Sequence, residues 1–166
     1  MRKMKLTNIL FVALIALAST TSWKAHSTET KIGSLMIQDL RARATAPEAP
    51  VGAGYLTIMN MGEQEDVLIR VNAPFAGHTE IHEIKMDGDV AKMRPLQSGL
   101  KIPAGQSVNL TPGGLHLMFM DLQHPLKAGD THTIVLHFKY HGEVSALLTV
   151  RSDPSQADTE IDHHHH

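Results

Sequence analysis

The chain has 166 residues, of which 42% are hydrophobic and 4% aromatic, and its formal net charge is −2. This length and hydrophobic content fit a single domain with a substantial core once the terminal segments are set aside. The charge and the scarcity of aromatic residues argue against nucleic-acid binding, and the absence of cysteine excludes disulfides, thiolate metal sites and CxxC redox motifs.

The first 25 residues have the pattern of a secretory signal peptide. A positively charged start precedes the apolar run 9–18, which at ten residues is too short to span a bilayer as a helix. Cleavage is expected between residues 18 and 25. We therefore predict export, no membrane attachment after cleavage and a folded domain over residues 26–151, with an uncleaved membrane anchor as the alternative.

From Leu35 onward the pattern is that of short β-strands separated by turns. The predicted strands are 35–41, 54–60, 66–71, 78–85, 90–94, 107–110, 115–121, 131–140 and 144–150. The residues 86–89 are expected to form a hairpin turn with Asp87-Gly88 at its centre. No helix longer than a turn or two is expected, so the fold class is all-β, a sandwich or barrel. The polar tail 152–166 is predicted to lack packed structure.

Histidines and methionines recur between residues 82 and 120. If 115–121 is a strand, His116 and Met118 project from the same face, because side chains at i and i+2 do so. An imidazole beside a thioether suits a soft or borderline metal, above all copper. His82 and Met93 would join this pair only if the 86–89 hairpin folds them back toward it.

Cu(I) favours soft, polarisable donors in low coordination numbers. Two neutral imidazoles and two thioethers would add no charge to the ion, and without a thiolate the site could give its metal away. Met86 and Met120 are candidate auxiliary ligands. The alternative interpretation is that the methionines fill the core and the histidines are merely solvated. This alternative is the stronger interpretation for any single residue, whereas the copper site is the stronger interpretation for the whole set.

The same stretch resembles the PCuAC family of periplasmic copper chaperones, whose signature is H-x10-M-x21-H-x-M. In this chain ten residues separate His82 from Met93, 22 separate Met93 from His116, and one separates His116 from Met118. The resemblance covers roughly residues 33–151. Further similar segments are HEIKM at 82–86, MRP at 93–95, IPAG at 102–105, PGGLH at 112–116 and GYLTI at 54–58.

The resemblance implies a cupredoxin-like Greek-key β-sandwich or barrel in the periplasm. It implies the role of Cu(I) ligand for His82, Met93, His116 and Met118, one by one. It also implies transfer of the ion to a copper site of a respiratory oxidase, with a Sco-type chaperone as a second partner. We expect a monomer. The extra residue between Met93 and His116 is placed in the loop 97–99, where an insertion does not shift strand register.

The four histidines at the end of the tail form a second candidate site. The tail could chelate Cu(II), Ni(II) or Zn(II) through His163, His164, His165 and His166. A native tail would capture Cu(II) and feed the main site after reduction, whereas a truncated purification tag would have no such role. His26 could add an amino-terminal Cu(II) site if cleavage placed it within the first three residues.

Five functions compete. The leading hypothesis is a metallochaperone that performs no catalysis. A copper oxidase or oxygenase would need a tightly held copper with an open position, and no second histidine cluster in the folded part supports one. A blue-copper electron carrier needs a cysteine ligand, which is absent. A copper buffer or resistance protein would share the site, and a metal-free structural β-sandwich would use its methionines only for packing.

Overall fold

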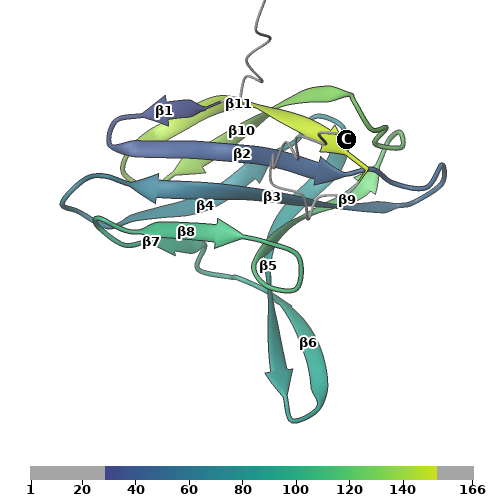
Figure 1. Ribbon diagram of the computed structural model, residues 1–166, viewed down its shortest axis with the longest axis horizontal. Coiled ribbons are helices and arrows are strands. Elements are labelled where there is room, and N and C mark those ends of the chain that lie inside the picture. Colours follow the sequence, from purple (N-terminus) through teal and green to yellow (C-terminus); the bar gives the residue numbers. More distant parts are fainter. Residues whose placement is uncertain (1–28, 153–166) are drawn as a thin grey trace, which may run out of the picture.

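The computed structural model describes residues 29–152, which form β-strands and no helix (Figure 1). None of these residues therefore belongs to a helix long and apolar enough to cross a membrane. The signal peptide predicted for residues 1–25 and almost all of the tail lie outside the described residues. The strands are β1 (Thr30–Ile32), β2 (Leu35–Arg43), β3 (Val51–Asn60), β4 (Asp66–Asn72), β5 (Ala76–Asp87), β6 (Val90–Pro95), β7 (Leu100–Ile102), β8 (Ser107–Leu110), β9 (His116–Leu122), β10 (Thr131–Phe138) and β11 (Gly142–Arg151).

All nine predicted strands are present, and the all-β prediction is confirmed. The strands β1 and β7 were not predicted, because three residues are too few to show an alternating pattern. β10 ends at Phe138, so Tyr140 lies outside the strand and is 66% exposed. The hairpin turn is narrower than predicted. Asp87 and Val90 pair, and Gly88 and Asp89 form the loop with a positive φ at Gly88, as expected for glycine in the first central position.

One sheet contains all the strands, in the order β6-β5-β9-β3-β2-β11-β10-β4-β7, with β1 paired to β2 and β8 paired to β3. Every pair is antiparallel except β2 with β11. The sheet curls, because β4 contacts β5 and β7 contacts β3 although they are distant in the strand order. The two ends thus close over a single core, and β9 lies between β3 and β5 despite its later place in the chain.

The alternating burial of residues in β9 determines which side chains lie on the face away from the core. Leu117 and Phe119 are fully buried, so alternation directs His116, Met118 and Met120 to the opposite side of the strand. The Phe119 ring lies over Gly54 of β3, where a Cβ would stand only 2.7 Å from ring atom Cε2. The absence of a side chain at residue 54 therefore lets β3 and β9 approach closely. This approach fixes the position of His116, Met118 and Met120 on the other side of β9.

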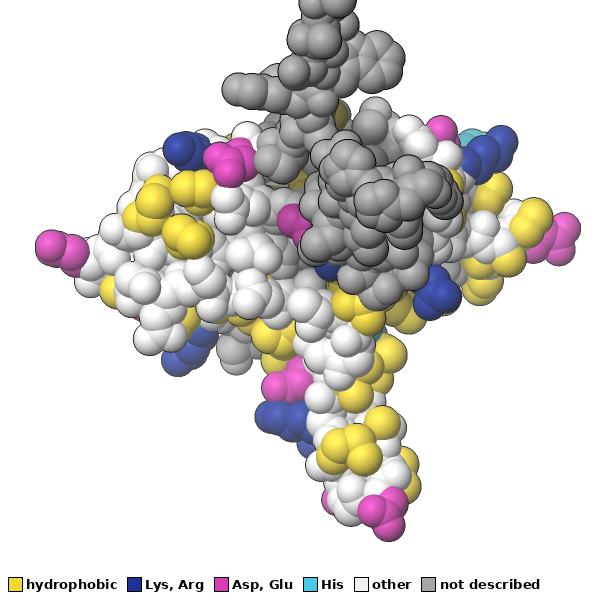
Figure 2. Space-filling view, in the orientation of Figure 1, with side chains coloured by type: hydrophobic (Ala, Val, Ile, Leu, Met, Phe, Trp, Pro, Cys, Tyr) yellow, Lys and Arg dark blue, Asp and Glu magenta, His cyan; other side chains and the backbone are white. Residues whose placement is uncertain are grey.

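The β5–β6 hairpin projects from the body as an arm (Figure 1). β6 is an edge strand in which every residue is exposed, and apolar side chains gather on the arm in the space-filling view (Figure 2). Among them are Met86, which is 66% exposed, and Met93, which is 49% exposed. The charged side chains of the arm pair with each other, Lys85 with Glu83 and Lys92 with Asp87.

Candidate metal centre

Neighbouring strands β6, β5 and β9 bring the four predicted ligands to one face of the sheet. His82 of β5 lies directly opposite His116 of β9. Met118 is two residues farther along β9, and Met93 lies opposite Ile84, two residues beyond His82 on β5. Residues that lie opposite each other, or two apart along a strand, share a face. The hairpin therefore folds Met93 back onto the face that carries His82, diagonally across from it.

The two histidines form a close, buried pair. Their ring centroids are 5.7 Å apart and their planes are inclined at 75°, and the residues are 8% and 4% exposed. A metal-bound imidazole nitrogen lies about 2 Å from its metal, and the ring centroid about 1 Å farther away. Two imidazoles on one ion can therefore have centroids up to about 6 Å apart, so the observed separation is compatible with a shared ion.

Hydrogen bonds determine which ring nitrogens are free. Nδ1 of His116 lies 3.0 Å from the carbonyl oxygen of Gly114. Because a carbonyl only accepts, Nδ1 carries the proton and Nε2 keeps its lone pair. Nε2 of His82 lies 2.6 Å from Oε2 of Glu80, whereas Nδ1 of His82 is buried without a hydrogen-bond partner. A buried nitrogen without a partner is costly, and a metal ion would supply the missing contact.

The methionines differ in exposure and in distance from the histidine pair. Met118 is half-buried and lies opposite Glu80. Met86 and Met120 share the face of the site, but they lie four residues from His82 and His116 respectively. Four residues of strand span about 13 Å, so both methionines start farther from the histidine pair along the strand than Met93 and Met118 do.

Harder ligands do not surround the site. Within the part of the chain that the structure describes, no three His, Asp, Glu or Cys side chains come together to hold a metal. Sequence reasoning missed Glu80, although its position two residues before His82 on a strand was a usable signal. A groove of about 270 Å³ opens beside Met118, lined by the loop 43–49 and by residues 51–53 of β3.

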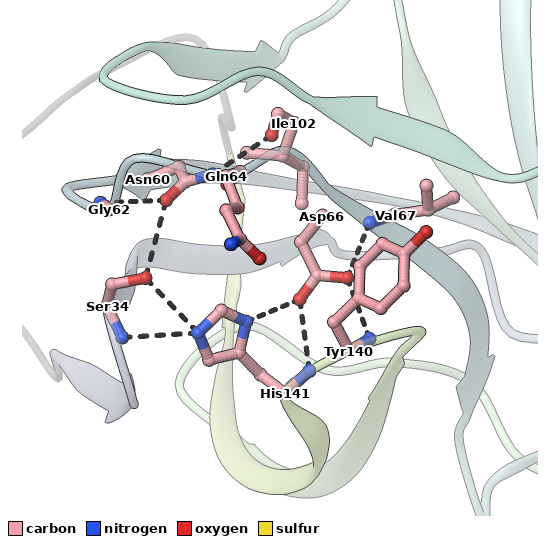
Figure 3. A network of polar contacts seen from close by, with 9 residues as sticks. All are labelled: Ser34, Asn60, Gly62, Gln64, Asp66, Val67, Ile102, Tyr140 and His141. Atoms are coloured by element: carbon pink, nitrogen blue, oxygen red, sulfur yellow. Dashed lines mark hydrogen bonds and ion pairs between the residues drawn. The ribbon is translucent and has the colours of Figure 1, made fainter.

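A second polar cluster, drawn in Figure 3, has the order of a catalytic triad. Nδ1 of His141 lies 2.6 Å from Oδ2 of Asp66, and Nε2 of His141 lies 3.2 Å from Oγ of Ser34. Serine, histidine and aspartate in this sequence of contacts can activate a nucleophile. Sequence reasoning missed this cluster, because its members lie 75 and 107 residues apart.

The surroundings of the cluster indicate a structural role instead. Asp66 is completely buried, and its carboxylate also accepts backbone N–H groups from Val67, Tyr140 and His141. Burial acts to raise the pKa of Asp66, but the hydrogen bonds from the His141 side chain and these N–H groups together lower it. Asn60 continues the network, because it accepts the Gly62 N–H and donates to two carbonyls. The cluster thus joins the β1–β2 turn, the β3–β4 connection and the β10–β11 turn.

Known proteins share both the sequence and the fold. A family model described as "Putative lipoprotein LpqE-like" matches residues 35–150. A relative from Leifsonia xyli subsp. xyli, "Putative lipoprotein Lxx21020", is 29% identical over 122 residues, which are 74% of this chain and 73% of that protein.

Two similar solved structures carry copper in their names. The "Copper-bound PCuAC domain from PmoF2" has a TM-score of 0.64 at 21% identity and matches 75% of this chain and 98% of its own. The solution structure of CuI-DR1885 from Deinococcus radiodurans has a TM-score of 0.59 at 26% identity, over 80% of this chain and 86% of its own. These structures share the all-strand architecture of the chain. On the family match over residues 35–150 and on this likeness, the chain belongs to the LpqE-like family of PCuAC-type domains and has their cupredoxin-like β fold.

Proposed function

We propose that this protein is an exported chaperone that binds one Cu(I) through His82, Met93, His116 and Met118 and passes it to an acceptor. The observation that carries the proposal is the strand register, which gathers these four residues on one face around a buried histidine pair. The copper in the related DR1885 structure, at 26% identity, supports copper as the cargo.

The donors have complementary parts in holding and releasing the ion. The imidazoles are the stronger donors and are buried, so they define the inner side of the site. The thioethers are neutral and soft, which suits Cu(I) and adds no charge that would hold the ion. Met93 lies on the exposed arm, where an incoming ligand from an acceptor could replace it first. Transfer then proceeds by ligand exchange, without catalysis by this chain.

The acceptor we propose is a copper centre of a respiratory oxidase, with a Sco-type chaperone as a second partner. The signal-peptide pattern at residues 1–25 and the lipoprotein name of the Leifsonia relative support export, and we propose the periplasm as the compartment of this exchange. A copper buffer or resistance protein would have the same site without an acceptor. Delivery of the ion to apo-oxidase separates these two functions.

We further propose that the tail histidines 163–166 capture Cu(II), and that a one-electron reductant from outside this chain converts it to Cu(I) before the main site receives the ion. The carbonyl of Arg151, next to the start of the tail, accepts a 2.8 Å hydrogen bond from Ala44, which lines the groove beside Met118. β11 and β9 are separated by β2 and β3, a distance of about 14 Å across the sheet. The tail could span up to about 50 Å when extended, so its histidines can reach the groove.

The test is a Cu(I) competition titration against a chromophoric chelator. The protein is the mature chain from residue 26 with alanine at positions 163–166, so that the tail does not contribute. We expect one tight equivalent, weakened more than about 100-fold in His116→Ala, a larger effect than loss of an outer hydrogen-bond partner usually has. Met118→Leu should weaken binding clearly, whereas Met61→Leu, at an exposed methionine of the β3–β4 turn, is the matched control. Absence of competitive binding by the parent protein would refute the proposal.

A further inference from the structure

Glu80 is the charged side chain in closest contact with the proposed ligands. Its Oε2 lies 2.6 Å from Nε2 of His82, two residues along β5 on the same face. Across the sheet Glu80 lies opposite Met118, just as His82 lies opposite His116. The carboxylate is therefore next to both a histidine and a methionine ligand in the register, as Ile84 is on the other side of His82.

The contact dictates the tautomer of His82. A carboxylate only accepts, so a neutral His82 donates its Nε2 proton to Glu80 and keeps the lone pair on Nδ1. Nδ1 is the nitrogen that is buried without a hydrogen-bond partner. His116 has the opposite arrangement, because the Gly114 carbonyl accepts from its Nδ1. Histidine ligands commonly donate their second ring N–H to a carboxylate or a backbone carbonyl, which orients the ring and fixes the tautomer.

We propose that Glu80 is a positioning residue of the copper site: it holds His82 in the tautomer that binds through Nδ1, while the Gly114 carbonyl holds His116 in the tautomer that binds through Nε2. The part of this inference that concerns copper affinity rests on the proposed function. The part that concerns the tautomer concerns the metal-free protein and stands independently.

The other oxygen of the Glu80 carboxylate faces His78. Oε1 of Glu80 lies 4.0 Å from Nε2 of His78, and Nδ1 of His78 lies 3.4 Å from Oδ2 of Asp121. Asp121 has a positive φ of 52° and approaches Gly77, where a Cβ would lie 3.0 Å from the Cβ of Asp121. Carboxylates and imidazoles thus alternate along this side of the sheet from Asp121 through His78 and Glu80 to His82. The one hydrogen bond of this row joins Glu80 to His82.

The experiment compares three variants of the mature chain with alanine at positions 163–166. Glu80→Ala removes the acceptor, and Glu80→Gln keeps an acceptor oxygen without the charge. Glu83→Ala removes the neighbouring carboxylate, which pairs with Lys85 on the other face of β5, and is the matched control. Long-range ¹H–¹⁵N spectra report the tautomer of His82 without metal, and the chelator competition reports the affinity for Cu(I). The Glu80 side chain is 40% exposed, so its truncation leaves the core intact, which far-UV circular dichroism checks.

We expect the parent protein to carry the His82 proton on Nε2, and Glu80→Ala to shift it toward Nδ1 and weaken Cu(I) binding by about 10–100-fold. Glu80→Gln should restore the tautomer and most of the affinity, and Glu83→Ala should behave as the parent. A parent protein with the proton on Nδ1, or a Glu80→Ala variant with unchanged tautomer or unchanged affinity, would overturn the inference. If the parent bound no Cu(I), the proposed function would fail, and the metal-free spectra would still decide the tautomer.

Discussion

Replacement of Asp66 by asparagine should cost much of the stability of the domain. The two oxygens of Asp66 divide their partners: Oδ1 accepts the N–H groups of Val67 and Tyr140, and Oδ2 accepts the backbone N–H and the ring Nδ1 of His141. An asparagine amide can replace Oδ1, but its NH₂ group would then face two donors of His141. Each buried donor left without an acceptor costs about 1–3 kcal/mol, so the substitution should cost about 2–6 kcal/mol.

Thermal unfolding followed by far-UV circular dichroism measures this loss. At about 4 °C per kcal/mol for a domain of this size, the Tm of Asp66→Asn should fall by at least about 8 °C at pH 7. The lowered pKa of Asp66 gives a second signature. A carboxylate with a depressed folded pKa contributes stability that is complete above its unfolded value of about 3.9 and is lost as the pH falls through the folded pKa. The gap between wild type and variant should therefore narrow below about pH 4.

Ser34→Ala is the matched control for the network. It removes a hydroxyl that is only half-buried and should cost about 1 kcal/mol, the usual value of a single hydrogen bond. A stability loss below about 0.5 kcal/mol in Asp66→Asn, within the range of ordinary surface substitutions, would refute the structural role of the cluster. A gap that stays unchanged down to pH 3 would refute the role of the ionised carboxylate.

Three further predictions concern packing and metal binding. Gly54→Ala should destabilise the domain by about 1–3 kcal/mol through overpacking against Phe119, measured by urea unfolding, whereas Gly105→Ala, where a Cβ would meet nothing within 4 Å, tests backbone conformation alone. Free Cu(I) at 100 times its Kd should stabilise the parent by about 2.7 kcal/mol, and His116→Ala should abolish this shift in a thermal scan. Removal of residues 163–166 should abolish strong Cu(II) binding in a spectroscopic titration and leave the Cu(I) affinity unchanged; loss of both would contradict separate sites.

Most of the fold could be predicted from the sequence, because alternation and turn residues are local signals. The pair His116 and Met118 could also be predicted, because a spacing of two places both side chains on one face of a strand. The position of β9 between β3 and β5 depends on long-range pairing, so the approach of His82 to His116 could be expected only from the family resemblance. The contact between Glu80 and His82 depends on side-chain rotamers, and the network of Asp66 joins three distant connections. Neither the Glu80–His82 contact nor the Asp66 network produces a periodic pattern in the sequence.

The arm that carries Met93 has a consequence for the kinetics of the site. A two-stranded ribbon that projects from a sheet has little stability of its own, and β6 pairs only with β5. Its amide protons should therefore exchange with solvent at a much lower opening free energy than those of β9, which is paired on both sides. Met93 lies on the edge strand β6, whereas His82, His116 and Met118 lie on β5 and β9, which pair with each other, so we expect the segment of Met93 to open most readily. Local fraying of the arm would lower the coordination number by one while the core stays folded. If release proceeds through this opened state, the opening rate of β6 sets an upper limit on the release rate of the ion.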